Sequence, residues 1–468
     1  MDKRYYKTDP MSHQISALQN IRDKYYYALF MDMGTGKTKV SIDDMSYLYL
    51  NNKILFVLVI APNSNYMTWA DEIKKHSVVP THVYRHKIDK KFTFKKGILN
   101  YYLMNVEAFS HASGTKVIGP LVYSLRNSTC IIVDESTRIK NRTAKRTKSI
   151  LKLSYGVAYK RILSGFPVTK SPLDLWSQCS FLRPGLLGTD NFYAFRATYS
   201  IMRPVTTVSG RIVQAPVAFQ NLDHLLDQVK NFSFRVRKED CLDLPPKIYH
   251  TRLIEMTPEQ TKIYNELKNY ARTILKDEEA SYQNKLTEII KLHQVANGFV
   301  VTNDGSTVSI PNRKMDELHE VINETDDKII IWSNYVYTIK YITKELEKKY
   351  GSKSVVNFYG DVTVKDRHER VDAFQNNKDV RFFVANPATG GIGLTLTAAN
   401  TVVYFSNNFN LEERVQSEDR AHRKGQKKVV NYIDLICAKT IDVYIKHALT
   451  NKLKLSAKTM GEDILDFK

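Results

Sequence analysis

The chain has 468 residues, which is too long for one ordinary hydrophobic core and predicts two or three domains. Hydrophobic residues make up 43% of it and the formal net charge is +20, so wholesale disorder is excluded and a polyanionic partner is favoured, nucleic acid first and an anionic membrane surface second. No apolar run approaches the roughly 20 residues that cross a bilayer. Four dispersed cysteines and a charged N-terminus without an apolar signal region fit a reducing compartment without disulfides or zinc.

The first 180 residues alternate short apolar runs with helix-like polar segments, a pattern typical of an α/β domain with a parallel sheet. The strands expected here are residues 28–31, 54–61, 101–104, 129–133 and 159–163.

A glycine-rich turn at residues 32–38 follows the first expected strand and precedes helix-compatible sequence. Glycines let backbone N–H groups point at a phosphate, and a helix N-terminus adds partial positive charge. Lys37 would reach the β- and γ-phosphates of a nucleotide, and the Thr38 hydroxyl would bind Mg²⁺. Met31 stands where the general phosphate-loop pattern has a glycine. The other residues expected around the phosphates are Met33, Gly34, Thr35 and Gly36.

Two carboxylates, Asp134 and Glu135, come directly after the apolar strand at 129–133, at the end where open α/β sheets bind ligands. Asp134 would hold Mg²⁺ through water, and Glu135 would orient and deprotonate an attacking water. Taken alone, the pair would be a solvated strand end. The phosphate loop about 100 residues upstream favours the catalytic interpretation.

A basic segment follows, with nine Lys or Arg residues and no Asp or Glu between Arg138 and Arg161. Such a run is usually a solvated face, but its place after the acidic pair equally allows contact with nucleic acid, and both interpretations stay open.

Residues 181–250 differ from what precedes them. They begin with Arg183-Pro184-Gly185, and the stretch 205–217 around Ser209-Gly210 indicates a β-hairpin, which together predict an inserted subdomain. Residues 257–300 are expected to be helical, with Thr257 as N-cap and Pro258 in the first helical position.

The α/β rhythm then returns, with strands expected at 328–332, 354–359, 380–385, 401–405 and 430–435. The sequence therefore predicts a first α/β lobe at 1–180, the inserted subdomain at 181–250, a helical bridge at 251–311, a second α/β lobe at 312–455 and a tail at 456–468.

In this second lobe a glycine-rich turn with Gly391 and Gly393 follows the strand at 380–385, and a basic segment lies at 416–426. Arg420 and Arg423 are three residues apart, so on a helix they share one face. Two guanidinium groups aimed at a γ-phosphate would stabilise transferred charge, although spacing alone would favour an ordinary basic surface helix.

These segments, in this order, resemble superfamily 2 helicases and specifically the Swi/Snf-like ATPases, over residues 10–450. Residues 134–141 resemble the family's motif II, although they read Asp-Glu-Ser-Thr, and Phe166 in motif III replaces the usual threonine. Residues 416–426 resemble motif VI through Asp-Arg-x-His-Arg-x-Gly-Gln. The remaining similar segments are 60–72 for motif Ia, 163–176 for motif III, 244–264 for the bridge between lobes and 360–374 for the motif between IV and V.

The resemblance implies two RecA-like lobes, each a mostly parallel sheet flanked by helices, and hydrolysis of ATP with Mg²⁺. It implies that Gln14 contacts adenine and that Gly391 and Gly393 lie near the nucleotide. The catalytic residues that it implies are Lys37, Asp134, Glu135, Gln416, Arg420 and Arg423. The implied DNA contacts are Pro62, Asn63, Ser333, Asn334 and Thr389, with Lys140 and Asn141 added from the basic extension of motif II.

The function expected from this resemblance is a DNA-dependent ATPase that moves on duplex DNA without sequence specificity. It would remodel forks or junctions, by branch migration and limited unwinding, in repair, recombination or replication. We expect a monomer in a microbial or viral setting, in the cytoplasm or nucleoid and not secreted. Two alternatives stay open: a strand-separating DNA or RNA helicase with residues 205–217 as its wedge, and a non-unwinding ATP-gated DNA clamp or motor subunit.

Overall fold

The computed structural model describes residues 3–63, 65–206, 212–276, 282–302, 304–360, 364–390 and 394–462. The chain forms two compact units. Of the described residues, lobe one comprises 3–201, Phe219–Asp243 and 455–462, and lobe two comprises Met202–Ala218 and Leu244–Lys454. The last helix, α17 (Ile441–Met460), therefore begins in lobe two and ends in lobe one.

Lobe one is built on a seven-stranded sheet in the order β3-β4-β2-β5-β6-β1-β9, and every adjacent pair is parallel. Its strands are β1 (Tyr26–Met31), β2 (Phe56–Ala61), β3 (Thr81–Arg85), β4 (Leu99–Asn105), β5 (Thr129–Asp134), β6 (Tyr159–Leu163) and β9 (Ser233–Val236).

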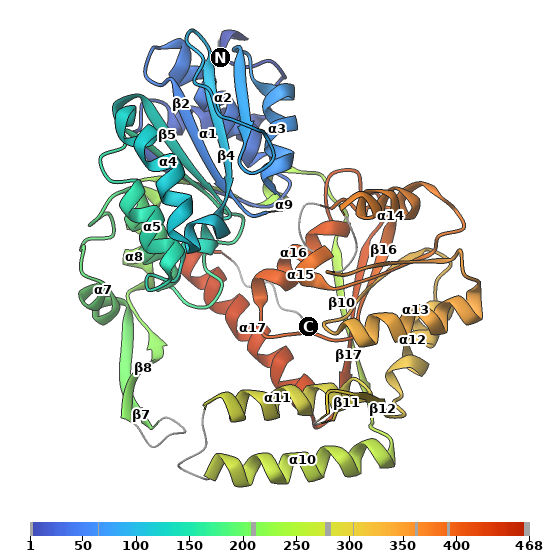
Figure 1. Cartoon of the computed structure of the whole chain (residues 1–468). Coiled ribbons are helices and arrows are strands. Elements are labelled where there is room, and N and C mark those ends of the chain that lie inside the picture. The colour runs from blue at the N-terminus through green and yellow to red at the C-terminus, as the bar shows by residue number, and fades with distance from the viewer. Residues whose placement is uncertain are drawn as a thin grey trace. The chain divides into compact units, whose positions relative to one another are not determined.

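Both faces of this sheet are covered by helices (Figure 1). Alternate residues of β1 enter two hydrophobic clusters, Ala28 and Phe30 in one and Tyr27 and Leu29 in the other. This double burial explains why β2 and β5 are apolar throughout, as is typical of parallel strands. Tyr27 and Leu29 share their cluster with residues of α1 (Ser12–Ile21), α2 (Lys37–Leu50) and α3 (Asn65–His76). The other cluster includes residues of α4 (Ala112–Ser124), α5 (Lys145–Leu153), α6 (Asp174–Leu182), α7 (Phe192–Tyr199) and α8 (Leu222–Lys230).

Short helical turns connect these elements. They are η1 (Lys3–Tyr5), η2 (Val106–Ser110), η3 (Arg126–Ser128), η4 (Ser136–Ile139) and α9 (Lys238–Cys241).

Lobe two repeats the design with a six-stranded parallel sheet in the order β10-β17-β16-β13-β15-β14. Its strands are β10 (Lys247–Ile254), β13 (Lys328–Trp332), β14 (Val355–Phe358), β15 (Phe382–Ala385), β16 (Ala399–Tyr404) and β17 (Val430–Cys437). Its helices are α10 (Pro258–Lys276), α11 (Tyr282–Ala296), α12 (Lys314–Asn323), α13 (Val336–Tyr350), α14 (Val364–Asn376), α15 (Pro387–Gly390) and α16 (Leu411–Ala421). The expected α/β architecture with two RecA-like lobes is thus confirmed.

Every strand expected in the two lobes is present. Strands β3, β9 and β10 were not expected, nor were β11 (Phe299–Val301) and β12 (Thr307–Ser309), which lie in the segment 251–311 expected as a helical bridge. Strands β3, β9 and β10 each lie at the edge of a sheet, where one side of the strand lacks a neighbour and the side chains are partly exposed. An edge strand therefore lacks the continuous apolar run that marks a buried one.

The stretch 181–250 is distributed over both lobes, since α8 and β9 belong to lobe one and β10 to lobe two. Its expected hairpin strands, β7 (Ser200–Thr206) and β8 (Ile212–Phe219), pair in a two-stranded sheet, and Ser209-Gly210 lies outside the described residues. A second small sheet pairs β11 (Phe299–Val301) with β12 (Thr307–Ser309).

The predicted helix start at Thr257 is confirmed. Pro258 opens α10, the Gln260 backbone N–H donates to Thr257 Oγ1 (3.1 Å), and Thr257 N–H donates to Gln260 Oε1 (3.3 Å). These reciprocal bonds form a capping box.

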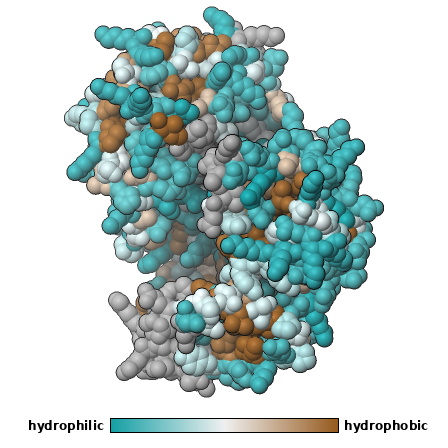
Figure 2. All heavy atoms as spheres, turned by 45° about the vertical axis from the view of Figure 1, so that its right-hand side comes forward, coloured by the Kyte–Doolittle hydropathy of each residue, from teal (hydrophilic) through white to brown (hydrophobic). Residues whose placement is uncertain are grey.

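The surface in Figure 2 is mostly hydrophilic, and its hydrophobic areas are separate rather than continuous. None of the described helices combines the length and apolar character that crossing a membrane requires.

Candidate nucleotide and nucleic-acid sites

The glycine-rich turn of lobe one encloses the Lys37 side chain. Gly34 and Gly36 adopt φ angles of 80° and 91°, which favour glycine, and a Cβ on Gly36 would lie 2.2 Å from Gln14 Nε2. Lys37 opens α2 and is buried, and its Nζ donates to the carbonyls of Met31 (2.7 Å) and Asp32 (3.1 Å). The turn thus places a buried ammonium beside a helix N-terminus, an arrangement suited to phosphate.

Gln14 lies against this turn from the first part of α1. Its Nε2 donates to the Thr35 carbonyl (3.0 Å), and its Oε1 accepts from Met11 N–H (3.0 Å). The neighbouring His13, which sequence reasoning missed, contacts the same carbonyl through Nε2 (2.7 Å). Both side chains are buried, so the start of α1 fixes the phosphate loop from one side.

Asp134 and Glu135 lie at the carboxyl end of β5, in the interior of the lobe-one sheet. Asp134 Oδ2 accepts from Trp69 Nε1 (2.9 Å) and its Oδ1 accepts from the Glu135 backbone N–H (3.0 Å). Glu135 has φ 48° and ψ 61°, a left-handed conformation that costs a non-glycine residue roughly 1–3 kcal/mol and that clusters at functional sites.

Lys37 and the acidic pair influence one another electrostatically. Burial lowers the pKa of Lys37, while the negative charges of Glu135, Asp134 and Asp32 act to raise it. The structure thus brings together the lysine and both carboxylates that the sequence predicted for one site.

Gly165, in the segment that resembles motif III, packs directly on the phosphate loop. A Cβ there would lie 3.0 Å from Met33 Cγ, 3.1 Å from Met33 N and 3.4 Å from Lys37 Nζ. A second contact ties this segment to motif II, because Gln178 accepts from Ser136 Oγ (2.6 Å) and donates to the Pro167 carbonyl (2.9 Å).

The residues present fit ATP and Mg²⁺. The buried ammonium and the cradle that a Cβ on Gly36 would fill suit a phosphate chain. Asp134 and the half-buried Thr38 offer oxygen ligands of the kind Mg²⁺ prefers. Among the described residues no group of three or more His, Cys, Asp or Glu could hold a metal ion. Mg²⁺ usually combines one or two carboxylates with phosphates and waters, so it needs no such cage.

The basic segment after Glu135 does not form one face. Arg161 is fully buried with its Nε 2.9 Å from Asp44 Oδ2, so neither surface interpretation applies to it. The Arg142 guanidinium lies 4.3 Å from the Phe192 ring centroid. Lys140 Nζ donates to Thr169 Oγ1 (2.5 Å), and Asn141 is exposed.

Of the two motif Ia residues, Pro62 is buried and Asn63 is exposed. Asn105 Nδ2, from the end of the neighbouring strand β4, donates to Asn63 Oδ1 (3.1 Å). Asn63 is therefore the one that presents its side chain at the surface.

In lobe two, Arg420 and Arg423 converge on one carbonyl. Helix α16 ends at Ala421, so the expectation that both arginines share a helix face is wrong. The chain turns after His422, yet Arg420 Nη1 (3.1 Å) and Arg423 Nη1 (3.0 Å) both donate to the Leu394 carbonyl. Burial lowers the pKa of Arg423, and the ion pairs among the described residues include no carboxylate partner for it.

Gln416 is buried on α16, where its Nε2 donates to Glu412 Oε1 (3.4 Å) and its carbonyl accepts from Arg420 Nε (2.9 Å). Gly391 and Gly393 lie outside the described residues.

A buried ionic cluster holds α16 on the sheet of lobe two. Arg414 pairs with Asp434 of β17, donates through Nε to Glu418 Oε1 (2.8 Å) and lies 3.5 Å from the Tyr404 ring centroid. Burial acts to raise the pKa of Asp434, but Arg414 and Lys446 lower it to about 2.

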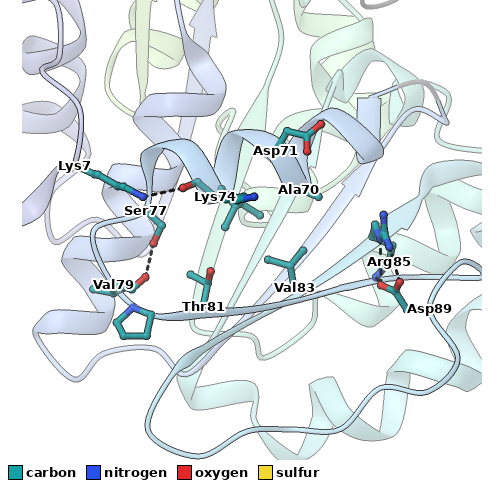
Figure 3. Close-up of a pocket in the computed structure, with 12 residues that line it drawn as sticks. Lys7, Ala70, Asp71, Lys74, Ser77, Val79, Thr81, Val83, Arg85 and Asp89 are labelled. Carbon is teal, nitrogen blue, oxygen red and sulfur yellow. Dashed lines mark hydrogen bonds and ion pairs between the residues drawn. The ribbon is translucent and has the colours of Figure 1, made fainter. Parts of the chain in front are cut away.

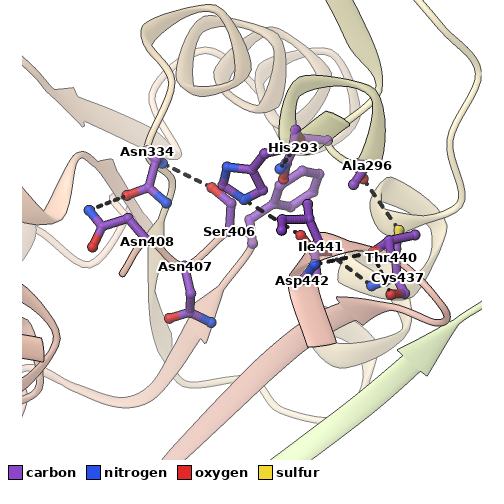
Figure 4. A network of polar contacts seen from close by, with 12 residues as sticks. His293, Ala296, Asn334, Ser406, Asn407, Asn408, Cys437, Thr440, Ile441 and Asp442 are labelled. Atoms are coloured by element: carbon purple, nitrogen blue, oxygen red, sulfur yellow. Dashed lines mark hydrogen bonds and ion pairs between the residues drawn. The ribbon is translucent and has the colours of Figure 1, made fainter. Parts of the chain in front are cut away.

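The lobe-two residues predicted to contact DNA lie at the ends of the adjacent strands β13 and β15. The Asn334 backbone N–H donates to Ser406 Oγ (2.9 Å), and Asn408 Nδ2 donates to Asn334 Oδ1 (3.1 Å), as Figure 4 shows. Ser333 is buried, and the Thr389 backbone N–H donates to the Asn386 carbonyl (3.1 Å).

Asn386 was missed from the sequence, although its Nδ2 donates to the Asn334 carbonyl (2.9 Å). The available signal was its place directly after a buried strand and before Pro387.

The same region contains a buried polar group (Figure 4). Lys314 is fully buried and donates to Asp442 Oδ2 (2.7 Å) and to the Phe405 carbonyl (3.0 Å). His293 Nδ1 bonds Tyr335 OH (2.7 Å), and burial lowers the pKa of His293 to about 4.

A hollow of about 610 Å³ in lobe one is lined by α3 and the edge strand β3 (Figure 3). At its rim Lys7 Nζ donates to the Lys74 carbonyl (3.0 Å), and Arg85 pairs with Asp89 (2.7 Å). Its lining includes none of the residues predicted to bind nucleotide or DNA.

Residues 13–299, more than half of the chain, match the SNF2-related domain, and residues 313–425 match the helicase conserved C-terminal domain. An uncharacterized ATP-dependent helicase of Mycoplasma pneumoniae is 27% identical over 95% of this chain and 41% of its own length. The ATP-dependent helicase FUN30 of Saccharomyces cerevisiae is 24% identical over 93% of this chain and 45% of its own length. This chain thus spans less than half the length of these curated relatives.

The solved Sulfolobus solfataricus SWI2/SNF2 ATPase core in complex with dsDNA is 26% identical, with a TM-score of 0.44, over 99% of this chain and 95% of that one. On the domain matches, the chain belongs to the SNF2-related ATP-dependent helicases of superfamily 2, a family of ATP-hydrolysing enzymes.

Proposed function

We propose that this chain hydrolyses ATP to translocate on duplex DNA without sequence specificity. The observation that carries the proposal is the buried Lys37 ammonium in a glycine-shaped loop, within electrostatic reach of Asp134 and the strained Glu135. Membership of a helicase family supports nucleic acid as the track. A net charge of +20 supports binding through phosphates rather than through base edges.

The roles follow from the chemistry of each group. Lys37 and the N–H groups of residues 33–38 would bind the phosphates, and Gln14 would contact adenine, as the family resemblance implies. Thr38 and Asp134 would hold a Mg²⁺ ion, which when bound neutralises phosphate charge. Glu135 orients the attacking water and accepts its proton.

Lobe two would supply further catalytic groups. Arg420 and Arg423 would stabilise the charge of the transferred group, with Gln416 and the turn containing Gly391 and Gly393 beside them.

The proposed DNA contacts belong to both lobes. Pro62, Asn63, Lys140 and Asn141 of lobe one and Ser333, Asn334 and Thr389 of lobe two are the proposed contacts. Within this activity we place fork and junction remodelling, through branch migration and limited unwinding, in repair, recombination or replication. This finer assignment depends on the family resemblance, and so does a place in the cytoplasm or nucleoid.

The test is the rate of ATP hydrolysis with single-stranded, duplex, forked and four-way DNA. We expect duplex-containing DNA to stimulate hydrolysis, and forked or four-way DNA to do so most. Glu135→Gln should abolish this stimulation while DNA binding remains. Hydrolysis that no DNA stimulates would overturn the proposal and would favour a passive ATP-gated clamp.

A strand-separating helicase is the second candidate, and the β7–β8 pair favours it. This ribbon exposes apolar side chains along both strands, including Ile201 (41% exposed), Ile212 (68%) and Val217 (49%). A ribbon whose two faces are both exposed could insert between the strands of a duplex as a wedge. Displacement of one strand from a long plain duplex distinguishes the two, because a translocase leaves such a duplex intact.

A further inference from the structure

Arg235, the third residue of β9, lies behind the phosphate loop and joins four other groups. Its Nη1 donates to the carbonyls of Phe30 (3.1 Å) and Gly165 (3.1 Å) and lies 3.0 Å from Asp32 Oδ1. Its Nε donates to Glu462 Oε1 (2.5 Å). One guanidinium therefore connects the ends of β1 and β6 with a residue that follows α17.

Asp32 links Arg235 to the phosphate loop. Its Oδ2 accepts from the Lys238 backbone N–H (3.0 Å). Its own carbonyl accepts from Lys37 Nζ (3.1 Å) and from Thr35 Oγ1 (2.7 Å). The residue that pairs with Arg235 through its side chain thus holds Lys37 and Thr35 through its backbone.

The three charged groups are largely withdrawn from water. The side chains of Glu462, Arg235 and Asp32 are 18%, 20% and 28% exposed. Burial acts to lower the pKa of Arg235, but Asp32 and Glu462 raise it above its ordinary value. Without Glu462, Asp32 would be the sole carboxylate paired with the Arg235 guanidinium among the described residues. One negative charge beside Arg235 would then be lost.

Packing fixes the position of Glu462. Met460 is buried in the larger cluster of lobe one. Gly461 turns the chain with φ 67°, and a Cβ there would lie 2.4 Å from Leu226 Cδ2. The end of α17 therefore delivers the Glu462 carboxylate to one defined place.

We propose that Glu462 is a positioning residue for the phosphate loop, acting through Arg235 and Asp32 on Lys37 and Thr35. It sets the affinity of lobe one for the phosphates of ATP while leaving the chemical step to other residues. This inference rests on the proposed ATP-driven function.

The test compares Glu462→Gln with Lys458→Gln, a change of an exposed residue in the last turn of α17, just before Glu462. Binding of a fluorescent ATP analogue gives Kd, and hydrolysis with saturating duplex DNA gives KM and kcat. We expect Glu462→Gln to raise Kd and KM for ATP about tenfold, the size of one charged hydrogen bond, with kcat within about twofold of wild type. Lys458→Gln should match wild type in all three.

A purely structural role predicts a different result. If Glu462→Gln lowers the melting temperature but binds ATP like wild type, the inference is overturned. If Glu462→Gln does not fold, Glu462→Asp keeps the charge at shorter reach. Weaker ATP binding by Glu462→Asp supports the inference, and unchanged binding overturns it. Failure of the wild-type chain to hydrolyse ATP would instead contradict the proposed function.

Discussion

Lobe one holds the groups proposed to bind phosphate beside three carboxylates, whereas lobe two holds its two arginines against a carbonyl of its own chain. The charge of Lys37 is balanced by Asp32, Asp134 and Glu135. Arg423 is half-buried, and its guanidinium has no carboxylate partner among the described residues. Partial burial of a charge without an opposite charge beside it is costly, and a phosphate would compensate for that cost. This difference is the basis for the proposal that lobe one binds the nucleotide and lobe two contributes to catalysis.

The largest effect should come from Arg423→Ala. Loss of an arginine that stabilises transferred phosphoryl charge lowers kcat by about 10³-fold or more. ATP binding should persist, because the groups of lobe one remain. Steady-state hydrolysis with saturating duplex DNA and the Kd for ATP measure the two quantities, and Lys427→Ala, an exposed neighbour, is the control. If ATP binding is lost together with kcat, the division of roles between the lobes is wrong.

Gly36→Ala should weaken ATP binding about tenfold, because its Cβ meets Gln14 Nε2 at 2.2 Å and φ is +91°. Gly97→Ala separates the effect of backbone strain from the effect of the clash with Gln14. Gly97 has φ +78° with no atom within 4 Å of the added Cβ, so this substitution introduces backbone strain without a clash. Backbone strain should cost both variants about 1 kcal/mol of unfolding free energy, and only Gly36→Ala should change the Kd for ATP. Equal Kd values for both would show that the contact with Gln14 is unimportant.

His293→Gln should change how the stability of lobe two depends on pH. The pKa of His293 is about 4 when folded, below its ordinary value of 6.5, so the unfolded chain binds more protons between these values. Stability therefore falls as pH drops from 6.5 toward 4, by about 1 kcal/mol between pH 7 and 5.5. Urea unfolding followed by circular dichroism should show that His293→Gln lacks this loss. His447→Gln, at an exposed position, should keep it.

The smallest effect is expected for Lys140→Gln. A single phosphate contact contributes equally to all DNA sequences, so affinity should fall a few-fold on any duplex, and the slope of log affinity against log salt should decrease by about 1. Fluorescence anisotropy at several salt concentrations measures both. Lys439→Gln, an exposed lysine of lobe two, should leave the slope unchanged. An unchanged slope for Lys140→Gln would remove this residue from the DNA path.

The sequence alone predicted the features that depend on neighbouring residues. The interior strands were predicted because they are continuous apolar runs, and the phosphate loop was predicted because glycines precede Lys37. The edge strands β3, β9 and β10 were missed because most of their side chains are at least partly exposed, whereas the edge strand β14 was predicted. The burial of Arg161 could not be foreseen, since its partner Asp44 lies on a distant helix.

Two further features depended on long-range contacts. Helix α16 ends before Arg423, so the three-residue spacing could not predict how Arg420 and Arg423 lie relative to each other. They lie close together because both donate to the Leu394 carbonyl. Glu462 lies in residues expected as a tail, and its partner Arg235 is more than 200 positions earlier.

Helix α17 has a consequence for how the protein is made. Lobe one contains the earliest residues of the chain, but its core includes Met460 and its phosphate loop is connected to Glu462. A ribosome therefore releases most of this lobe long before the last pieces of it emerge. Lobe one therefore lacks part of its core and of its polar contacts until lobe two has been synthesised. Its folding can be completed only after translation of lobe two, although most of lobe one is translated first.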